Sequence, residues 1–184
     1  MIGFLGVVIG ALISLYGVRY AHKLTLEKAE IDRKNEIRAL IQSIKDEVET
    51  LRGIYMDSVG DGLEKHKEGE PFKYYFLVTQ EYFTVYSSNA DKIGMIKDDG
   101  LRKSIVEAYS AGRSLIDTYN TNNDIFRTYD HNNRLFNITE KPVFKEEADY
   151  NIQRMSEYAT ALKTKHLQFK EAVDALLNNI ENFN

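Results

Sequence analysis

The side chains with the clearest capacity for chemistry lie in residues 119–134, which read YNTNNDIFRTYDHNNR. This stretch combines Arg127, His131 and Arg134 with several asparagines and aromatic rings. Guanidinium groups, amides and stacking rings are the groups with which proteins hold a nucleotide or a single-stranded nucleic acid. Arg113 precedes Arg127 by about four helical turns and lies on nearly the same helix face. These four residues form a candidate ligand site; the blander alternative is a polar helix end that runs into an ordinary Asn-rich loop.

No other pattern indicates catalysis. The histidines lie far apart and none is spaced as H-x-x-x-H, and the chain has no cysteine, P-loop or G-x-S-x-G motif. The paired carboxylates Asp98–Asp99 and Glu146–Glu147 sit at predicted helix starts, where capping and the helix dipole explain them. We therefore predict no catalytic site, no metal site and no cofactor, and we expect a protein that is not an enzyme. The formal net charge of −4 also disfavours binding to double-stranded DNA through bulk charge.

The elements that must position these residues begin with Met1–Val18, a stretch without any charge. As a helix it covers roughly 27 Å, close to the hydrocarbon thickness of a bilayer. A signal peptide would carry its positive charge before the apolar stretch, a surface helix would show a polar face, and a core helix is rarely apolar all round. We predict a transmembrane helix over residues 1–18. Because Arg19, His22 and Lys23 follow it, the N-terminus should lie outside the plasma (bacterial inner) membrane and the rest in the cytoplasm.

Small residues repeat along this predicted span. Gly3, Gly10 and Gly17 are spaced by seven, Gly6 and Gly10 form a GxxxG, and Ser14 adds another small side chain. In lipid, helices associate where small residues let their backbones approach closely. We predict self-association through these positions; the alternative is that glycine is simply common in membrane helices.

The rest of the chain should be helical. From residue 20 to Tyr55 there is no proline, and apolar residues at alternating spacings of four and three from Ile37 to Tyr55 form a heptad seam. The glycine-rich, mixed-charge stretch that follows indicates a loop. We expect an all-α protein in which the transmembrane helix continues into a long cytosolic helix, packed in an antiparallel helical bundle. The predicted parts are a span (1–18), a juxtamembrane helix or stalk (19–56), a linker (57–71) and a bundle (72–184) that helix 19–56 completes.

Within the bundle, an aromatic stripe predicts a helix over 72–92, although the run KYYFLV also has strand propensity. A helix from Gly100 to about Tyr129 and another from Val143 almost to the C-terminus should follow, separated by a break over 132–142. Their predicted inward positions are Leu101, Ile105, Tyr109, Gly112, Ile116, Tyr119 and Ile125 or Phe126, then Phe144, Ala148, Ile152, Met155, Ala159, Leu162, Leu167, Val173, Leu176, Ile180 and Phe183.

The uncharged glycine-heptad span, the basic juxtamembrane helix, FKYYFLVTQEYFTVYSSNADKIGMI and LRKSIVEAYSAGRSLIDTY resemble the plan of small single-span membrane effectors of bacterial anti-phage defence systems. One such effector is the channel-forming protein paired with a nucleotidyltransferase in the Hailong system. The resemblance covers the plan of the whole chain. It implies a homo-oligomer, such as a tetramer, whose N-terminal helices gather into a pore and whose cytosolic bundle senses an oligonucleotide or nucleotide signal from a synthase.

Two main hypotheses follow. The first is a regulated pore or ion channel in which Arg19, His22 and Lys23 form rings at the cytosolic mouth. The second is a non-conducting helical scaffold that an oligomeric coiled coil anchors to membrane lipid. A membrane-tethered ligand sensor without conductance is a further alternative, and it shares the predicted site at Arg127 and Arg134.

Overall fold

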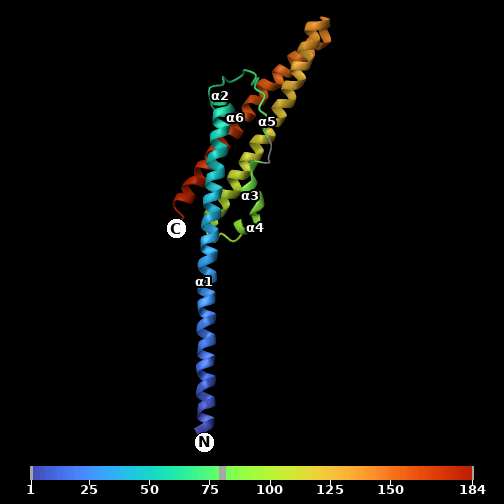
Figure 1. Cartoon of the computed structure of the whole chain (residues 1–184). Coiled ribbons are helices and arrows are strands. Elements are labelled where there is room, and N and C mark those ends of the chain that lie inside the picture. Colours follow the sequence, from blue (N-terminus) through green and yellow to red (C-terminus); the bar gives the residue numbers. More distant parts are fainter. Residues whose placement is uncertain (1, 79–81, 184) are drawn as a thin grey trace. The chain divides into compact units, whose positions relative to one another are not determined.

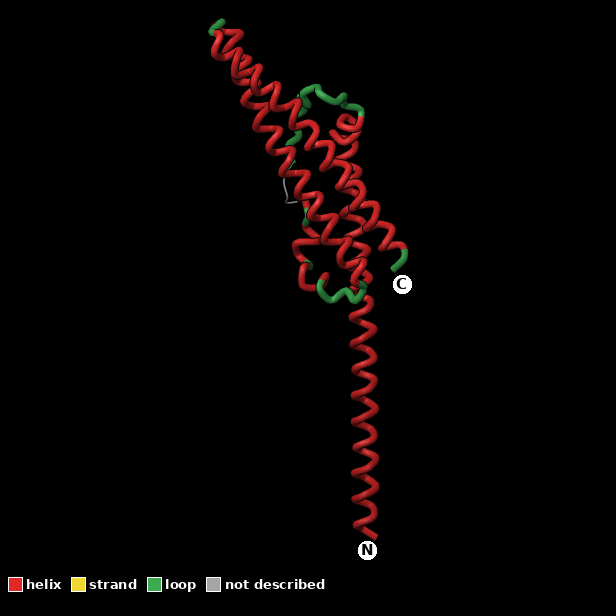
Figure 2. The backbone as a smooth tube through the Cα atoms, turned by 180° about the vertical axis from the view of Figure 1, so that it is seen from behind, coloured by secondary structure: helices red, strands yellow, loops and turns green. Residues whose placement is uncertain are grey.

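The computed structural model describes residues 2–78 and 82–183, with side chains from residue 14 onward. The chain divides into two units, Met1–Gln42 and Ser43–Asn184. Within the described ranges every regular element is a helix (Figure 2), which confirms the all-α prediction.

The first helix, α1, runs from Ile2 to Tyr55 and takes in both the predicted span and the predicted stalk. Across the part of the chain that the structure describes, no helix combines the length and the apolar character needed to cross a membrane. Residues 1–13, which make up most of the predicted span, lie outside the residues whose side chains are described.

The predicted linker starts too early. A π-helix, η1 (Met56–Gly60), and a short helix, α2 (Asp61–Glu64), follow α1 without a break, and loop structure begins only after Glu64. The reason is burial: Val59 and Leu63 follow Tyr55 at spacings of four, and all three side chains are buried. The two glycines and several charges of this stretch favour a loop, but burial of the apolar series keeps it helical.

Two long antiparallel helices, α5 (Asp99–Thr139) and α6 (Pro142–Glu181), pack along each other in the second unit (Figure 1). Asp98 caps α5 by accepting a hydrogen bond from the backbone N–H of Leu101 at 2.9 Å. Glu140, in the left-handed conformation with φ of 54°, ends α5, and Pro142 opens α6. The predicted break over 132–142 is therefore wrong for most of its length, because α5 continues through the asparagines to Thr139.

The predicted inward faces of α5 and α6, and the predicted seam at the end of α1, are largely confirmed. On α6 one prediction is wrong, because Leu167 is 55% exposed and the apolar stripe passes instead through His166 and Phe169, both buried. Buried residues at the other predicted positions include Ile44, Val48, Tyr55, Leu101, Ile105, Tyr109, Gly112, Ile116, Tyr119, Ile125, Ala148, Met155, Ala159, Leu162, Val173 and Leu176.

The predicted helix over 72–92 is also wrong. Residues 72–78, here called the extended segment, form neither helix nor strand, and among the described residues of this range the α-helices are α3 (Thr84–Ser88) and α4 (Ala90–Ile93). Glu47 of α1 fixes the start of α3: its carboxylate accepts hydrogen bonds from the Val85 N–H at 2.8 Å and the Thr84 hydroxyl at 3.0 Å. The same carboxylate accepts the Tyr109 hydroxyl at 2.6 Å, which ties α1, α3 and α5 together.

Candidate functional site

The predicted ligand residues lie on α5, where most of them already have partners in the chain. Arg127 pairs with Asp124 at 2.5 Å, and Arg134 pairs with Asp130 at 2.8 Å, each one helical turn away. His131 is exposed between them. Arg113 lies earlier on the same helix and is half-buried, with its Nε unpartnered among the described residues.

Two asparagines of the same stretch hold the extended segment. Asn123 accepts a hydrogen bond from the Phe76 N–H at 3.1 Å and donates to the Phe76 carbonyl at 2.7 Å. Asn122 donates to the carbonyls of Phe72 and Tyr74, each at 3.3 Å. Both amides are buried. They supply the backbone partners that the segment would otherwise obtain from a helix or a sheet, because buried backbone groups need hydrogen bonds.

Cations and rings form a second set of contacts between α5 and the residues before it. The guanidinium of Arg127 lies 5.9 Å from the centre of the Tyr75 ring, and that of Arg113 lies 5.3 Å from the Tyr86 ring. Lys73 in turn lies 5.0 Å from the ring of Tyr129. The amide and arginine groups that suggested a ligand site thus hold a segment of the chain itself, and a ligand role for Arg113, Arg127, His131 and Arg134 stays a prediction.

Of the residues predicted for the span and its cytosolic end, Gly3, Gly6 and Gly10 lie outside the residues whose surroundings are described. A Cβ built on Gly17 would meet no atom within 4 Å. Ser14, Arg19, His22 and Lys23 are exposed, and Lys23 pairs with Glu27 at 3.7 Å.

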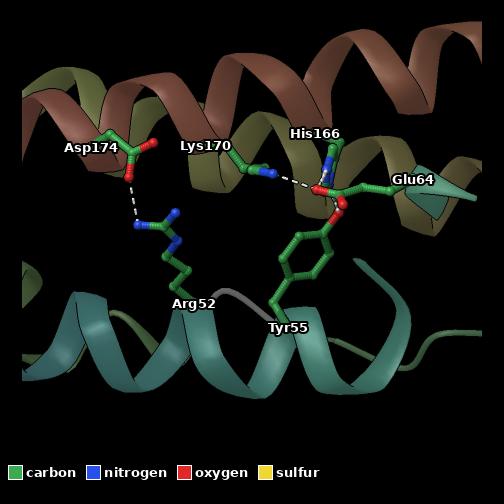
Figure 3. A network of polar contacts seen from close by, with 6 residues as sticks. All are labelled: Arg52, Tyr55, Glu64, His166, Lys170 and Asp174. Atoms are coloured by element: carbon green, nitrogen blue, oxygen red, sulfur yellow. Dashed lines mark hydrogen bonds and ion pairs between the residues drawn. The ribbon is translucent and has the colours of Figure 1, made fainter. Parts of the chain in front are cut away.

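A buried polar network, which the sequence analysis missed, joins α1, α2 and α6 (Figure 3). The Tyr55 hydroxyl lies 2.6 Å from Nδ1 of His166, and Nε2 of His166 lies 3.2 Å from the Glu64 carboxylate. Lys170 also binds that carboxylate. At the edge of the network, Arg52 pairs with Asp174 at 2.6 Å. Tyr55 and His166 are almost wholly buried, so their polar atoms depend on each other for hydrogen bonds.

The partners assign the proton of a neutral His166. A carboxylate only accepts, so Nε2 carries the hydrogen and donates to Glu64, and Nδ1 accepts from the Tyr55 hydroxyl. The Tyr119 hydroxyl lies 3.4 Å from that of Tyr55 and can donate to it. The hydrogen bonds then all run in one direction, from Tyr119 through Tyr55 and His166 to Glu64. With His166 neutral, every group in this series of hydrogen bonds has a partner.

The surroundings of the network favour that state. Burial lowers the pKa of His166, and this effect outweighs the opposing influence of Glu64. The hydrogen bond from Lys170 lowers the pKa of Glu64, so that it stays ionised. Burial raises the pKa of Tyr55 to about 12 and raises that of Tyr119 as well, which keeps both hydroxyls protonated.

We expect stability to fall on both sides of neutral pH. Because the pKa of His166 is lower in the folded chain than its ordinary 6.5, its contribution is complete above pH 6.5 and is lost as the pH falls below it. Because the pKa of Tyr55 rises from 10.0 to about 12, its contribution is complete below pH 10 and is lost as the pH rises towards 12. Urea unfolding followed by circular dichroism measures both limbs. A urea midpoint unchanged between pH 8 and pH 5.5 would contradict the assignment for His166.

His166 could have been found from its spacing. It stands four residues after Leu162 and three before Phe169, so it occupies a position of the α6 heptad stripe. A histidine in such a stripe requires buried polar partners, and Tyr55 was already predicted to face inward. Nothing in the sequence placed Glu64, because its position depends on η1 and α2.

The network resembles a proton relay, but the burial of its side chains indicates a structural role. His166 and Tyr119 are 2% and 0% exposed, so neither can meet a substrate in this conformation. Within the described residues, no three His, Asp or Glu side chains are grouped so that they could hold a metal ion. Comparison with known proteins found no matching family model, no matching curated protein and no matching solved structure.

Proposed function

We propose that this chain is a homo-oligomeric membrane effector that forms a regulated pore in bacterial anti-phage defence. The observation that carries the proposal is the uncharged stretch Met1–Val18 followed directly by Arg19, His22 and Lys23. Residues 2–55 form the single helix α1, so the helix that would span the bilayer also supplies Tyr55 to the buried network. The glycine repeat supports association of several copies, for example four, in the membrane.

In this proposal the span crosses the bacterial inner membrane with its N-terminus outside and the second unit in the cytoplasm. A pore of glycine, valine and isoleucine conducts only when it is widened, in the manner of a hydrophobic gate. Rings of Arg19, His22 and Lys23 at its cytosolic mouth would favour anions. An oligonucleotide or nucleotide signal made by a partner synthase would act on the cytosolic bundle, and Arg127 and Arg134 remain the first residues to examine for its binding.

The test is the mass of the full-length protein in detergent, followed by single-channel recording of the same species in a lipid bilayer. We expect an oligomer of three or more copies with discrete conductance. Replacing both Arg19 and Lys23 with Glu should shift ion selectivity towards cations, whereas Lys141→Glu, in the turn between α5 and α6, should not. A monomer or dimer in a silent bilayer would overturn the pore and favour the non-conducting anchored scaffold.

A further inference from the structure

The part of α1 in the first unit carries an exposed apolar stripe. Tyr20, Leu24 and Ile31 have 57%, 47% and 58% of their surface exposed. At about 100° per residue, these three side chains fall within roughly 40° of one another around the helix axis. Apolar side chains gathered on one helix face mark a surface that another molecule covers.

This stripe continues the glycine repeat. Leu24 and Ile31 follow Gly17 at intervals of seven, so a single seven-residue series runs through residues 3, 10, 17, 24 and 31. The residue type changes where the predicted span ends. In lipid, glycine brings helices together because it permits close backbone approach. In water, burial of large apolar side chains does so. Each part of the series therefore holds the residue type that favours helix association in its own solvent.

The bundle does not use this series. Its next members are Arg38, Lys45 and Arg52, and the last two form ion pairs with Glu49 and Asp174. The seam that the second unit buries passes through other positions of α1, among them Ile44, Val48 and Tyr55. The helix therefore has two apolar stripes of different phase. The second is buried at Ile44, Val48 and Tyr55, although Leu26, which falls on the same phase, is exposed, and the first is exposed along its described length.

The charges beside the exposed stripe suit a second copy of the same helix. Glu27 and Lys34 lie three residues after Leu24 and Ile31, at the edge of the stripe. Glu27 pairs with Lys23 at 3.7 Å, and Lys34 pairs with Glu30 at 3.5 Å, within the same chain. Neighbouring copies in register would therefore not oppose unneutralised like charges. A strict seven-residue repeat is also the spacing that keeps two supercoiled helices in contact.

We propose that a second copy of this chain docks on the stripe formed by Gly17, Tyr20, Leu24 and Ile31, parallel and in register. This interface would extend the predicted contact of the membrane helices by two heptads into the cytoplasm. The proposal rests on the homo-oligomer of the proposed function. It adds the surface, the orientation and the register.

The chain has no cysteine, so single cysteines report on this surface without background. Leu24→Cys and Ile31→Cys place a thiol on the stripe, and Ala29→Cys places one on nearly the opposite face of the same turn of helix. Each full-length variant is reconstituted in liposomes of phosphatidylethanolamine and phosphatidylglycerol and treated with a short bismaleimide. We expect efficient dimer bands for the variants at 24 and 31 and severalfold weaker bands for the variant at 29. Equal crosslinking at all three positions, or crosslinking at 29 alone, would overturn the interface, as would its absence at 24 and 31.

Conductance of the same liposomes separates this inference from the proposed pore. Crosslinking at 24 and 31 in liposomes that do not conduct supports the interface and overturns the pore. If the liposomes conduct but the variant at 29 crosslinks as efficiently as the variants at 24 and 31, the pore stands and the interface is overturned. As a second readout, replacing both Leu24 and Ile31 with Asn should lower the mass of the detergent-solubilised species, whereas Ala29→Asn should leave it unchanged.

Discussion

Replacing His166 with Ala should lower the free energy of unfolding by about 3 kcal/mol, from lost packing and from the buried polar groups left without partners. His166 is 2% exposed and contacts both Tyr55 and Glu64. Its removal leaves the Tyr55 hydroxyl without its 2.6 Å partner and opens a void between α1 and α6. The variant should also lose the decline in stability below pH 6.5, because the group that titrates there is gone. Urea unfolding at pH 7.5 and pH 5.5 measures both effects.

His131→Ala is the matched control, because it removes the same side chain from an exposed position of α5. Its effect on the free energy of unfolding should stay within about 0.5 kcal/mol. A loss below about 1 kcal/mol for His166→Ala would show that the network contributes little to stability. An unaltered acid limb in that variant would show that another group titrates there.

Replacing Phe72 with Ala should lower the free energy of unfolding by about 3–5 kcal/mol, the range for a buried Phe. Phe72 is fully buried in a segment without helix or sheet, and its ring lies 6.3 Å from that of Tyr119 and 5.2 Å from that of His66. Its carbonyl accepts a hydrogen bond from Asn122. We therefore expect loss of this ring to release the extended segment from α5 as well as to leave a cavity.

Leu77→Ala provides the control, since Leu77 belongs to the same segment and is 75% exposed. It should change stability little. Hydrogen exchange distinguishes release of the segment from a general loss of stability. The backbone N–H of Phe76 donates a hydrogen bond to the Asn123 side chain. In Phe72→Ala this N–H should exchange much faster under native conditions. If that amide stays protected, the asparagines hold the segment without Phe72.

Much of the architecture follows from apolar spacing. The seams of α5 and α6 keep heptad positions over many turns, and burial of those positions determines which faces meet. The same logic carries α1 through Tyr55. For long helices with regular apolar stripes, the spacing of apolar residues in the sequence indicates which face will be buried.

The extended segment could not be predicted in this way. Its aromatic residues fit a helical stripe in sequence, but Phe72 and Phe76 instead contact α5 from a backbone without helix or strand that Asn122 and Asn123 hold. These partners lie about fifty residues away along the chain. A preference encoded locally was therefore overridden by a tertiary contact. The asparagines stand out in the sequence for their chemistry, but their role depends on this tertiary contact.

The π-helix η1 determines how the deletion of a residue would affect the buried network. Its five residues, Met56–Gly60, separate Tyr55 from Glu64, the two side chains that reach His166 from this stretch. A π-helical turn accommodates one residue more than an α-helical turn. Deleting one residue there would let the turn close as an α-helical turn, so that the residues that follow keep their orientation towards α6 and Glu64 can still reach His166. The fit between these groups should therefore survive a one-residue deletion within η1, whereas a one-residue deletion from the α-helical turn before Tyr55 would rotate that side chain by about 100° relative to the preceding part of α1.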